Sequence, residues 1–150
     1  EIPREVLRNF RYFVGSWKSE GTVGDVEFPG TWAARWGKGK NCLVRESSYS
    51  EDGETIFGTG VMGWDATKKL AVEFETEGNG TVFTSTHFIS KDGEWTSPTK
   101  ATAITDEGPV YVEVQRTFVF EAGDQLVIHG KHRIIDGEKA PNEKSVFKKQ

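Results

Sequence analysis

The stretch "FVGSWKSEG" (13–21) marks the point at which a helical pattern gives way to a strand-like one. In "IPREVLRNFRYFVG" (2–15), apolar residues recur at helical spacing and predict one short helix. Gly15 would end this helix, because glycine accepts the backbone change from helix to strand. Trp17 adds a large apolar side chain, whose indole N–H needs a partner where it is buried. The stretch therefore predicts a helix that leads directly into a first strand.

The remainder of the chain reads as a series of hairpins. The predicted strands are 17–24, 30–39, 41–50, 55–64, 70–78, 81–90, 95–105, 110–121, 126–135 and 144–149. Asp-Gly pairs at 52–53, 92–93 and 136–137 favour tight turns between strands. An open sheet of this many strands would leave exposed edges, which closure into a barrel removes. The pattern predicts an all-β fold, a single up-and-down antiparallel β-barrel of about ten strands with a short N-terminal helix. A two-sheet sandwich is the alternative.

Composition limits the domain count and the classes of partner. At 150 residues the chain forms one domain over 1–150, and a single cysteine excludes an intrachain disulfide. A net charge of −4 without a basic block argues against a nucleic-acid partner. No apolar run reaches the ~18 residues of a membrane span. The chain begins at Glu1, so we expect either a cytoplasmic protein or an exported one whose leader is absent from the chain. The oligomeric state is not indicated.

The first half of the chain resembles the calycin superfamily, which includes lipocalins, fatty-acid-binding proteins and nitrobindins. The motifs that carry the resemblance are "FVGSW" (13–17), "RWGKGKNCLV" (35–44), "EDGE" (51–54) and "GVMGWD" (60–65). They are most similar to a bacterial family of uncharacterised lipocalin-like domains. The resemblance implies a calycin-like barrel in which Trp17 packs at the closed end, beneath the helix.

Alternation along each strand predicts which side chains face the interior, since neighbouring residues point to opposite faces. In 110–121 the apolar face is interrupted by Arg116, and in 126–135 a similar face is interrupted by His132. An unpaired buried cation is costly, so Arg116 must meet a carboxylate, such as that of Glu46, or an anionic ligand. In 70–78, alternation predicts that the apolar residues face inward. The residues predicted to form a solvated outer face are Glu73, Glu75 and Glu77.

The predicted interior combines aromatic walls with a few polar groups, which is typical of small-molecule sites. The candidate ligand-binding residues are Arg116, His132, Trp32, Trp36, Phe74, Phe118, His87 and Tyr49. The alternative for the two tryptophans is ordinary packing in the core. For His132 it is a hydrogen-bonded histidine of the core or the rim, without a ligand. No catalytic residue and no metal site is predicted. His129 and His132 would lie on opposite faces of a strand, where they cannot hold one metal.

The favoured function is non-enzymatic binding of a small apolar or amphipathic molecule inside the barrel, anionic where its head group meets Arg116. A structural or interaction domain with a packed interior is one alternative. Another is a small lyase or isomerase, whose residues would be His132, Arg116 and either Glu46 or Tyr49. This alternative rests only on the analogy of fold. A nitrobindin-like haem protein with His132 as axial ligand is the last, and outside that alternative no cofactor is predicted.

Overall fold

The computed structural model describes residues 1–90, 94–122 and 124–150. Within this part of the chain the elements are α1 (Arg4–Phe13), β1 (Gly15–Val23), β2 (Val26–Glu27), β3 (Gly30–Trp36), the short 3₁₀ turn η1 (Lys38–Lys40), β4 (Leu43–Glu51), β5 (Glu54–Asp65), β6 (Leu70–Glu77), β7 (Val82–Ile89), β8 (Trp95–Thr105), β9 (Gly108–Glu121), β10 (Gln125–Ile135), β11 (Glu138–Lys139) and β12 (Glu143–Lys149). The helix and the strands follow the predicted order. The two-residue strands β2 and β11 are additions that alternation did not indicate.

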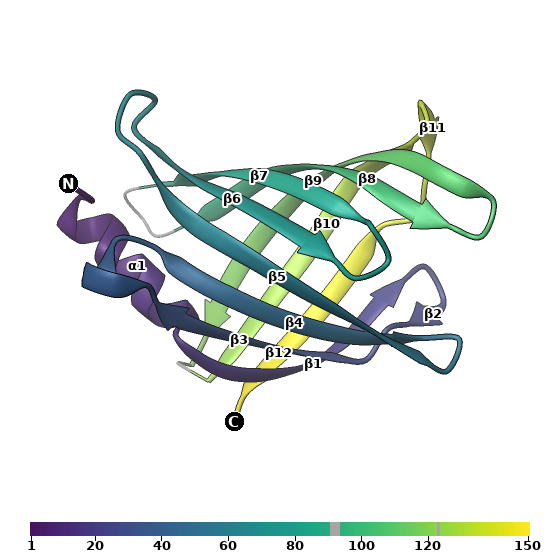
Figure 1. The fold of residues 1–150 in the computed structure, drawn as a ribbon, viewed down its shortest axis with the longest axis horizontal. Coiled ribbons are helices and arrows are strands. Elements are labelled where there is room, and N and C mark those ends of the chain that lie inside the picture. The colour runs from purple at the N-terminus through teal and green to yellow at the C-terminus, as the bar shows by residue number, and fades with distance from the viewer. Residues whose placement is uncertain (91–93, 123) are drawn as a thin grey trace.

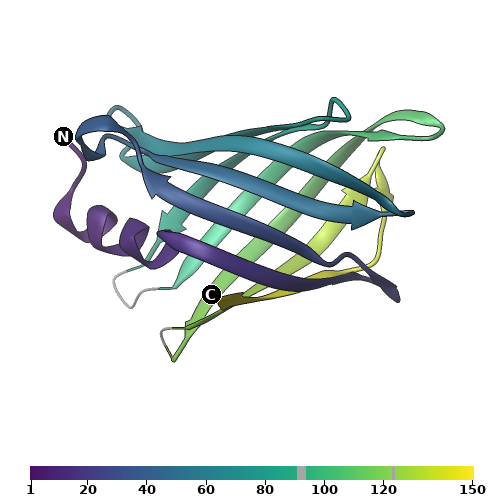
Figure 2. The same cartoon turned by 60° about the horizontal axis from the view of Figure 1, so that its bottom comes forward.

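The ten longer strands of the described residues form a closed antiparallel barrel. From β3 to β10 each strand pairs with the next, and β12 closes the circuit by pairing with both β10 and β1. Figures 1 and 2 show the strands wrapping around a common interior. Each longer strand has a partner on both sides, so closure removes the exposed edges of an open sheet. The predicted up-and-down barrel is confirmed, and the sandwich alternative is wrong.

Two of the predicted Asp-Gly turns adopt the backbone that tight hairpins require. Asp52 and Gly53 have φ of 49° and 83°, and Asp136 and Gly137 have φ of 48° and 85°. Two successive positive φ values are characteristic of the hairpin turn whose twist matches that of the flanking strands. The third predicted turn, at 92–93, lies outside the described residues.

The helix α1 lies across one end of the barrel (Figure 2). Its buried residues are Val6, Phe10 and Phe13. The Phe13 ring lies 5.0 Å from that of Trp95 and 5.2 Å from that of Phe120. These aromatic contacts bury the apolar side of the helix and close this end of the barrel. No helix of the described residues is long and apolar enough to cross a membrane.

The Gly-x-Trp motif joins α1 to β1. Gly15 has φ of +130°, a conformation that side chains with a Cβ rarely adopt. It therefore opens the first strand, whereas the helix ends at Phe13 and Val14 is its C-cap. Trp17 is buried, donates a hydrogen bond from Nε1 to the Phe13 carbonyl oxygen (3.0 Å) and stacks on Trp32 with ring centroids 5.2 Å apart. The indole thus satisfies a carbonyl at the helix end while filling the closed end of the barrel.

Candidate functional site

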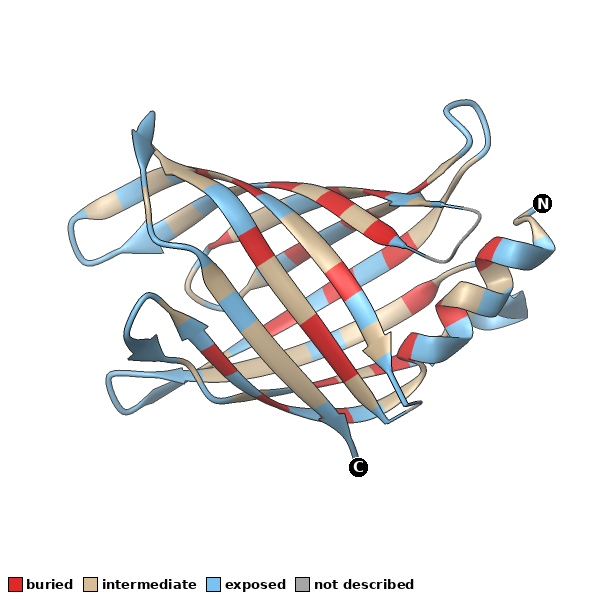
Figure 3. Cartoon of the chain, turned by 180° about the vertical axis from the view of Figure 1, so that it is seen from behind, coloured by how far each residue is buried: buried red, intermediate tan, exposed pale blue. Residues whose placement is uncertain are grey.

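A cavity of about 450 Å³ occupies the barrel. Its lining begins at Trp32 and Phe118, which belong to the core packed beneath α1. It continues to Val23, Glu51 and Thr105, at the far ends of β1, β4 and β8. Figure 3 shows how buried and exposed residues alternate along the strands that enclose it. The cavity therefore extends from an aromatic floor at the helix end toward the opposite mouth, and its volume is that of small-molecule sites, roughly 300–1,000 Å³.

One wall of the cavity is apolar and is built from neighbouring strands. Its apolar lining residues on β7, β8 and β9 are Phe83, Ala101, Ala103, Val110, Val112 and Val114, and Ser85 and Thr99, which hydrogen-bond to each other, also line these strands. The valines belong to the face of 110–121 that alternation assigned to the interior, and that assignment is confirmed as far as Phe118. A ligand surface laid against this wall would lose contact with water and gain apolar burial.

The facing wall on β4 and β6 is polar. Its lining residues are Arg45, Ser47, Tyr49, Glu73, Glu75 and Glu77. The intervening strand β5 carries Gly58 and Gly60 toward them, where a Cβ on Gly58 would lie 2.6 Å from Ser47 Oγ and 2.8 Å from Glu75 Oε1. Because these glycines have no side chain, groups from β4 and β6 meet across β5.

Arg45 is the cation of this polar wall. Its Nη1 donates to Glu73 Oε1, and its Nη2 lies 3.1 Å from Glu75 Oε2. Ser47 Oγ donates to Glu75 Oε1 over 2.7 Å. Among the described residues, Glu75 Oε2 has no hydrogen-bond partner, so its contact with Arg45 is an ion pair without hydrogen-bond alignment. One arginine therefore serves two nearly buried carboxylates.

His87 extends this network toward the floor. Trp95 Nε1 lies 2.8 Å from His87 Nδ1, and an indole nitrogen can only donate. Nδ1 is therefore the acceptor, and the ring proton sits on Nε2, which donates to Glu73 Oε2 (3.0 Å). Ser97 Oγ lies 2.7 Å from the same Nδ1, whose one lone pair it shares with the Trp95 N–H, and 3.3 Å from the Thr86 carbonyl oxygen, which also accepts from it. Ser97, His87 and Glu73 thus lie in a row, as in a serine–histidine–acid relay. Ser97 is 0% exposed, which keeps a substrate from its hydroxyl. The relay is structural.

The ionisation of Glu73 makes the fold sensitive to acid. Burial raises the pKa of Glu73, but the charge of Arg45 and the hydrogen bond from His87 outweigh burial and lower it to about 2, from 4.5. A carboxyl with a depressed folded-state pKa stabilises the fold above its unfolded pKa and loses that contribution as the pH falls through the folded value. We expect the free energy of unfolding to fall by on the order of 3 kcal/mol between pH 4.5 and 2.

Urea unfolding at several pH values measures this dependence, and Glu73→Gln should flatten it. Glu77 acts with the opposite sign, because its folded-state pKa is raised, so its contribution to stability is lost as the pH rises through that pKa. If the free energy of unfolding of the wild-type chain does not change between pH 4.5 and 2, the lowered pKa of Glu73 is wrong.

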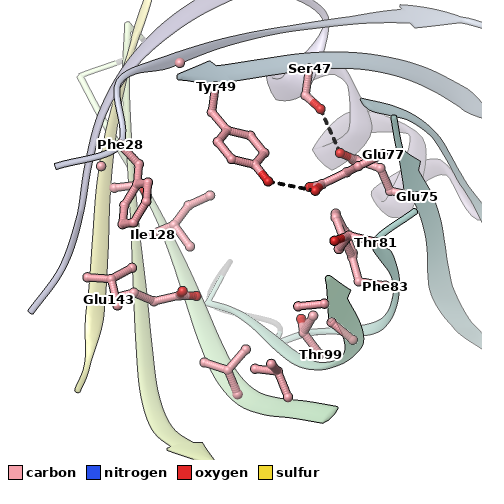
Figure 4. A pocket seen from close by; sticks show the side chains of 18 of the residues that line it. Phe28, Ser47, Tyr49, Glu75, Glu77, Thr81, Phe83, Thr99, Ile128 and Glu143 are labelled. Carbon is pink, nitrogen blue, oxygen red and sulfur yellow. Dashed lines mark hydrogen bonds between the residues drawn. The ribbon is translucent and has the colours of Figure 1, made fainter. Parts of the chain in front are cut away.

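Tyr49 and Glu77 form a pair at the mouth end of the polar wall (Figure 4). The Tyr49 hydroxyl donates to Glu77 Oε2 over 2.9 Å. Burial raises the pKa of Glu77, the Tyr49 hydrogen bond lowers it, and the charge of Glu75 raises it again, so that the net direction is upward. Burial and the neighbouring Glu77 raise the pKa of Tyr49 as well. This carboxyl therefore holds its proton more tightly than an ordinary glutamate.

Arg116 lies on a third side of the cavity. Its Nε donates to Glu143 Oε1 over 2.8 Å, and Arg133 Nε approaches Glu143 Oε2 at 4.0 Å. Burial raises the pKa of Glu143, and the charge of Arg116 lowers it below its usual value. The expected pairing of Arg116 with Glu46 is wrong, because Glu46 is exposed on the outer face of β4.

The inward position predicted for His132 is also wrong. The β9–β10 register shifts between Lys131 and Ile134, and His132 has φ of 52° within this irregularity. The extra residue reverses the alternation, as in a β-bulge, so that His132 is exposed while Arg133 lines the cavity. The haem alternative required His132 as the axial ligand. Because His132 lies outside the cavity, it cannot ligate a haem inside the barrel.

Phe74 and the glutamates of β6 exchange the faces predicted for them. Phe74 is 51% exposed and lies across from Val61 on the outer face of β5 and β6. Alternation separates the two faces of a strand but does not say which one is inside, and here the outer face is the apolar one. The glutamates are inside because Arg45, Tyr49 and His87 supply their partners.

The other predicted site residues lie at three levels of the barrel. Trp32, Tyr49, Arg116 and Phe118 line the cavity. Trp36 packs at the closed end with its ring 6.3 Å from that of Phe10, and His87 is buried in the network behind the polar wall. Charged lining residues that were not among the predicted site residues are Arg45, Glu73, Glu75, Glu77, Arg133 and Glu143; Arg45 lies on the same face of its strand as the predicted Tyr49. For those on β4 and β6, the signal in the sequence is the spacing of Gly58 and Gly60 within a strand. No group of three metal-ligating side chains occurs among the described residues.

Comparison with known proteins supports the architecture. No family model and no curated protein matches the chain. Among solved structures the chain is similar to a de novo designed fluorescence-activating β-barrel, with 13% sequence identity, a TM-score of 0.50, and coverage of 93% of this chain and 95% of that chain. It also matches a protein of unknown function from the DUF3598 family of Nostoc punctiforme, with 9% identity, a TM-score of 0.25, and coverage of 96% and 98%. The likeness to the designed barrel is one of fold alone.

Proposed function

We propose that this barrel is a non-enzymatic binding protein that holds a small amphipathic molecule in its interior. The observation that carries the proposal is the cavity of about 450 Å³, which has an apolar wall facing a polar one. A sealed structural core would bury its charges at a high desolvation cost, whereas an open cavity lets water or a ligand solvate them. A calycin-like assignment, from the motifs of the first half of the chain, agrees with this function.

Arg116 is the proposed anchor for an acidic or acceptor group of the ligand. In the part of the chain that the structure describes, its hydrogen bonding goes through Nε alone, and its side chain is 30% exposed. The two terminal guanidinium nitrogens are therefore available, and they present paired N–H donors that match a carboxylate. The ligand body would extend along Val112, Val114 and Phe118 of the same strand.

The remaining functional alternatives have less support. A packed interaction domain does not account for a cavity of this volume with charged walls. The lyase or isomerase alternative used His132, Arg116 and either Glu46 or Tyr49, and of these His132 and Glu46 lie on the outside of the barrel. Tyr49 and Arg116 remain in the cavity, where binding and orientation of a ligand are the roles that their contacts support.

Fluorescence titration with straight-chain alkanoates and aryl carboxylates tests this function. Trp32 lines the cavity, so we expect a saturable change in its emission when a carboxylate ligand binds. Arg116→Met should weaken binding roughly 10- to 100-fold, because a charge-assisted hydrogen bond contributes about 1.5–3 kcal/mol. Arg35→Met, on the exposed face of β3, is the matched control and should leave binding unchanged.

Absence of saturable binding across the panel would overturn the proposed function. Equal affinities of the Arg116 and Arg35 variants would overturn the role given to Arg116. Thermal unfolding of each variant shows that any loss of binding occurs in a folded protein.

A further inference from the structure

The charges around the cavity are divided between two sides, and the first side is positive. Arg116 and Arg133 both approach the carboxylate of Glu143, at 2.8 Å and 4.0 Å. Two guanidinium groups thus share one carboxylate, and the outer nitrogens of Arg116 are left for a ligand. We call these three residues the positive pole.

The second side is negative. Arg45 pairs with Glu73 and Glu75, and Glu77 follows on the same face of β6. Three carboxylates therefore stand against one guanidinium, and Glu51 adds a further carboxylate at the rim. We call Arg45 and the three glutamates of β6 the negative pole.

Two carboxylates of the negative pole are incompletely paired. Glu75 is 2% exposed, lines the cavity, and has no hydrogen-bond partner at Oε2 among the described residues, although Arg45 lies 3.1 Å away. The hydrogen bond that Glu77 accepts comes from Tyr49, a neutral donor. Each carboxylate oxygen can accept more than one hydrogen bond. A buried acceptor that has no donor costs desolvation free energy. Glu75 Oε2 is closed off from the lumen beside Arg45. A ligand nitrogen with several N–H groups would therefore bind the Glu77 carboxylate directly and feel the charge of Glu75 behind it.

The two poles face each other across the cavity. Figure 4 shows Glu143 on the opposite side of the lumen from the Tyr49–Glu77 pair. The charge of Arg116 acts across this space, because it lowers the pKa of Glu77 against the larger, opposite effect of burial. Arg116 and Glu77 line the same cavity of about 450 Å³, so one small molecule in it can contact both poles.

We propose that the ligand is dipolar, with an anionic group bound by Arg116 and an ammonium or amidinium group bound by Glu77, beside the buried charge of Glu75. This inference rests on the proposed function, since it names the class of molecule that the cavity holds. A simple carboxylate would leave the negative pole without its missing donors, and a simple amine would leave Arg116 unused. A linear ligand must also span the lumen, so one length of spacer between the two charged groups binds best.

Calorimetric titration with ω-amino carboxylates, from 4-aminobutanoate to 12-aminododecanoate, tests the proposal. Alkanoates and alkylammonium ions of the same chain lengths are the single-charge controls. We expect one ω-amino carboxylate to bind at least about tenfold tighter than either control of its length, as one additional charge-assisted hydrogen bond implies.

Variants of the negative pole separate the contribution of the cationic group. Glu77→Gln should weaken the preferred ω-amino carboxylate about tenfold while leaving the matched alkanoate unchanged or tighter. Tyr49→Phe removes the neutral donor but keeps the carboxylate, so it should retain or strengthen the binding of the ω-amino carboxylate. Glu20→Gln, at an exposed position of β1, is the matched control and should change neither affinity.

The outcomes distinguish this proposal from the function on which it rests. If alkanoates bind and no ω-amino carboxylate binds more tightly at any length, the dipolar ligand is wrong and the binding function stands. Tightest binding of the alkylammonium ions, or an unchanged ω-amino carboxylate affinity in a folded Glu77→Gln protein, would equally overturn the dipolar ligand. If no compound of the three series binds and the carboxylate panel also gives no fluorescence change, the binding function itself is wrong.

Discussion

Replacement of Arg45 by methionine is expected to lower the free energy of unfolding by about 3–5 kcal/mol, the usual cost of removing one partner from a buried ion pair. Arg45 neutralises both Glu73 and Glu75, and its Cζ lies 5.3 Å from the centroid of the Trp32 ring. Methionine fills a similar volume but leaves two nearly buried carboxylates without a cation. Urea unfolding at pH 7 measures the loss.

The matched control for Arg45 is Arg35→Met, on the exposed face of the adjacent strand, which should change stability by less than about 0.5 kcal/mol. Combining Arg45→Met with Glu73→Gln and Glu75→Gln should recover much of the loss, because no unpaired charge then remains. Equal stabilities of the two single arginine variants would show that the polar wall is solvated far more than its burial indicates.

Trp17→Ala is expected to be about as damaging, at about 3–5 kcal/mol, because it removes a large side chain from a packed site. Trp17 is 1% exposed, stacks on Trp32 and donates a hydrogen bond to the Phe13 carbonyl oxygen. Its loss opens a cavity beneath α1 and leaves that carbonyl unpaired. Trp17→Phe keeps most of the apolar contact and should cost less than Trp17→Ala.

Phe57→Ala is the control for an aromatic truncation, since Phe57 is 67% exposed on the outer face of β5. It should change the free energy of unfolding by no more than about 0.5 kcal/mol. Chemical unfolding of the three variants side by side ranks them. If Trp17→Ala is as mild as Phe57→Ala, the closed end of the barrel does not depend on the Gly-x-Trp motif.

The architecture could be predicted from local signals, because each of them acts over a few residues. The Asp52-Gly53 turn fixes a hairpin by its own backbone preferences, and the strongly apolar alternation along 110–121 leaves one choice of inner face. Gly15 and Trp17 mark the join between helix and barrel for equally local reasons. Sequential hairpins then leave closure as the way to pair both edges.

The site could be predicted only in part, because its chemistry depends on partners that are distant in the sequence. Glu75 faces inward since Ser47 and Arg45 reach it across the bare surface of Gly58. From strand β6 alone, the apolar face that carries Phe74 is the better candidate for the interior. Alternation cannot rank two faces when the inner one is charged and the outer one apolar.

The position of His132 shows a second limit of alternation. One irregular residue in β10 reverses the two faces from that point onward, so Arg133 takes the inward place predicted for His132. Alternation detects such a bulge only where a strongly apolar face resumes after it. The stretch that follows, Ile134-Ile135, is apolar on both faces and gives no such signal.

Methyl NMR during a ligand titration tests the central claim most directly, since it reports where the ligand lies. Decanoate or the preferred ω-amino carboxylate is added to protein labelled at alanine and valine methyl groups. The account predicts saturable shifts at Ala101, Val112 and Val114, which line the cavity, and unchanged signals at Val61 and Val119, which are exposed outside. Shifts confined to Val61 and Val119, or no shifts at saturating ligand, would contradict binding in the interior.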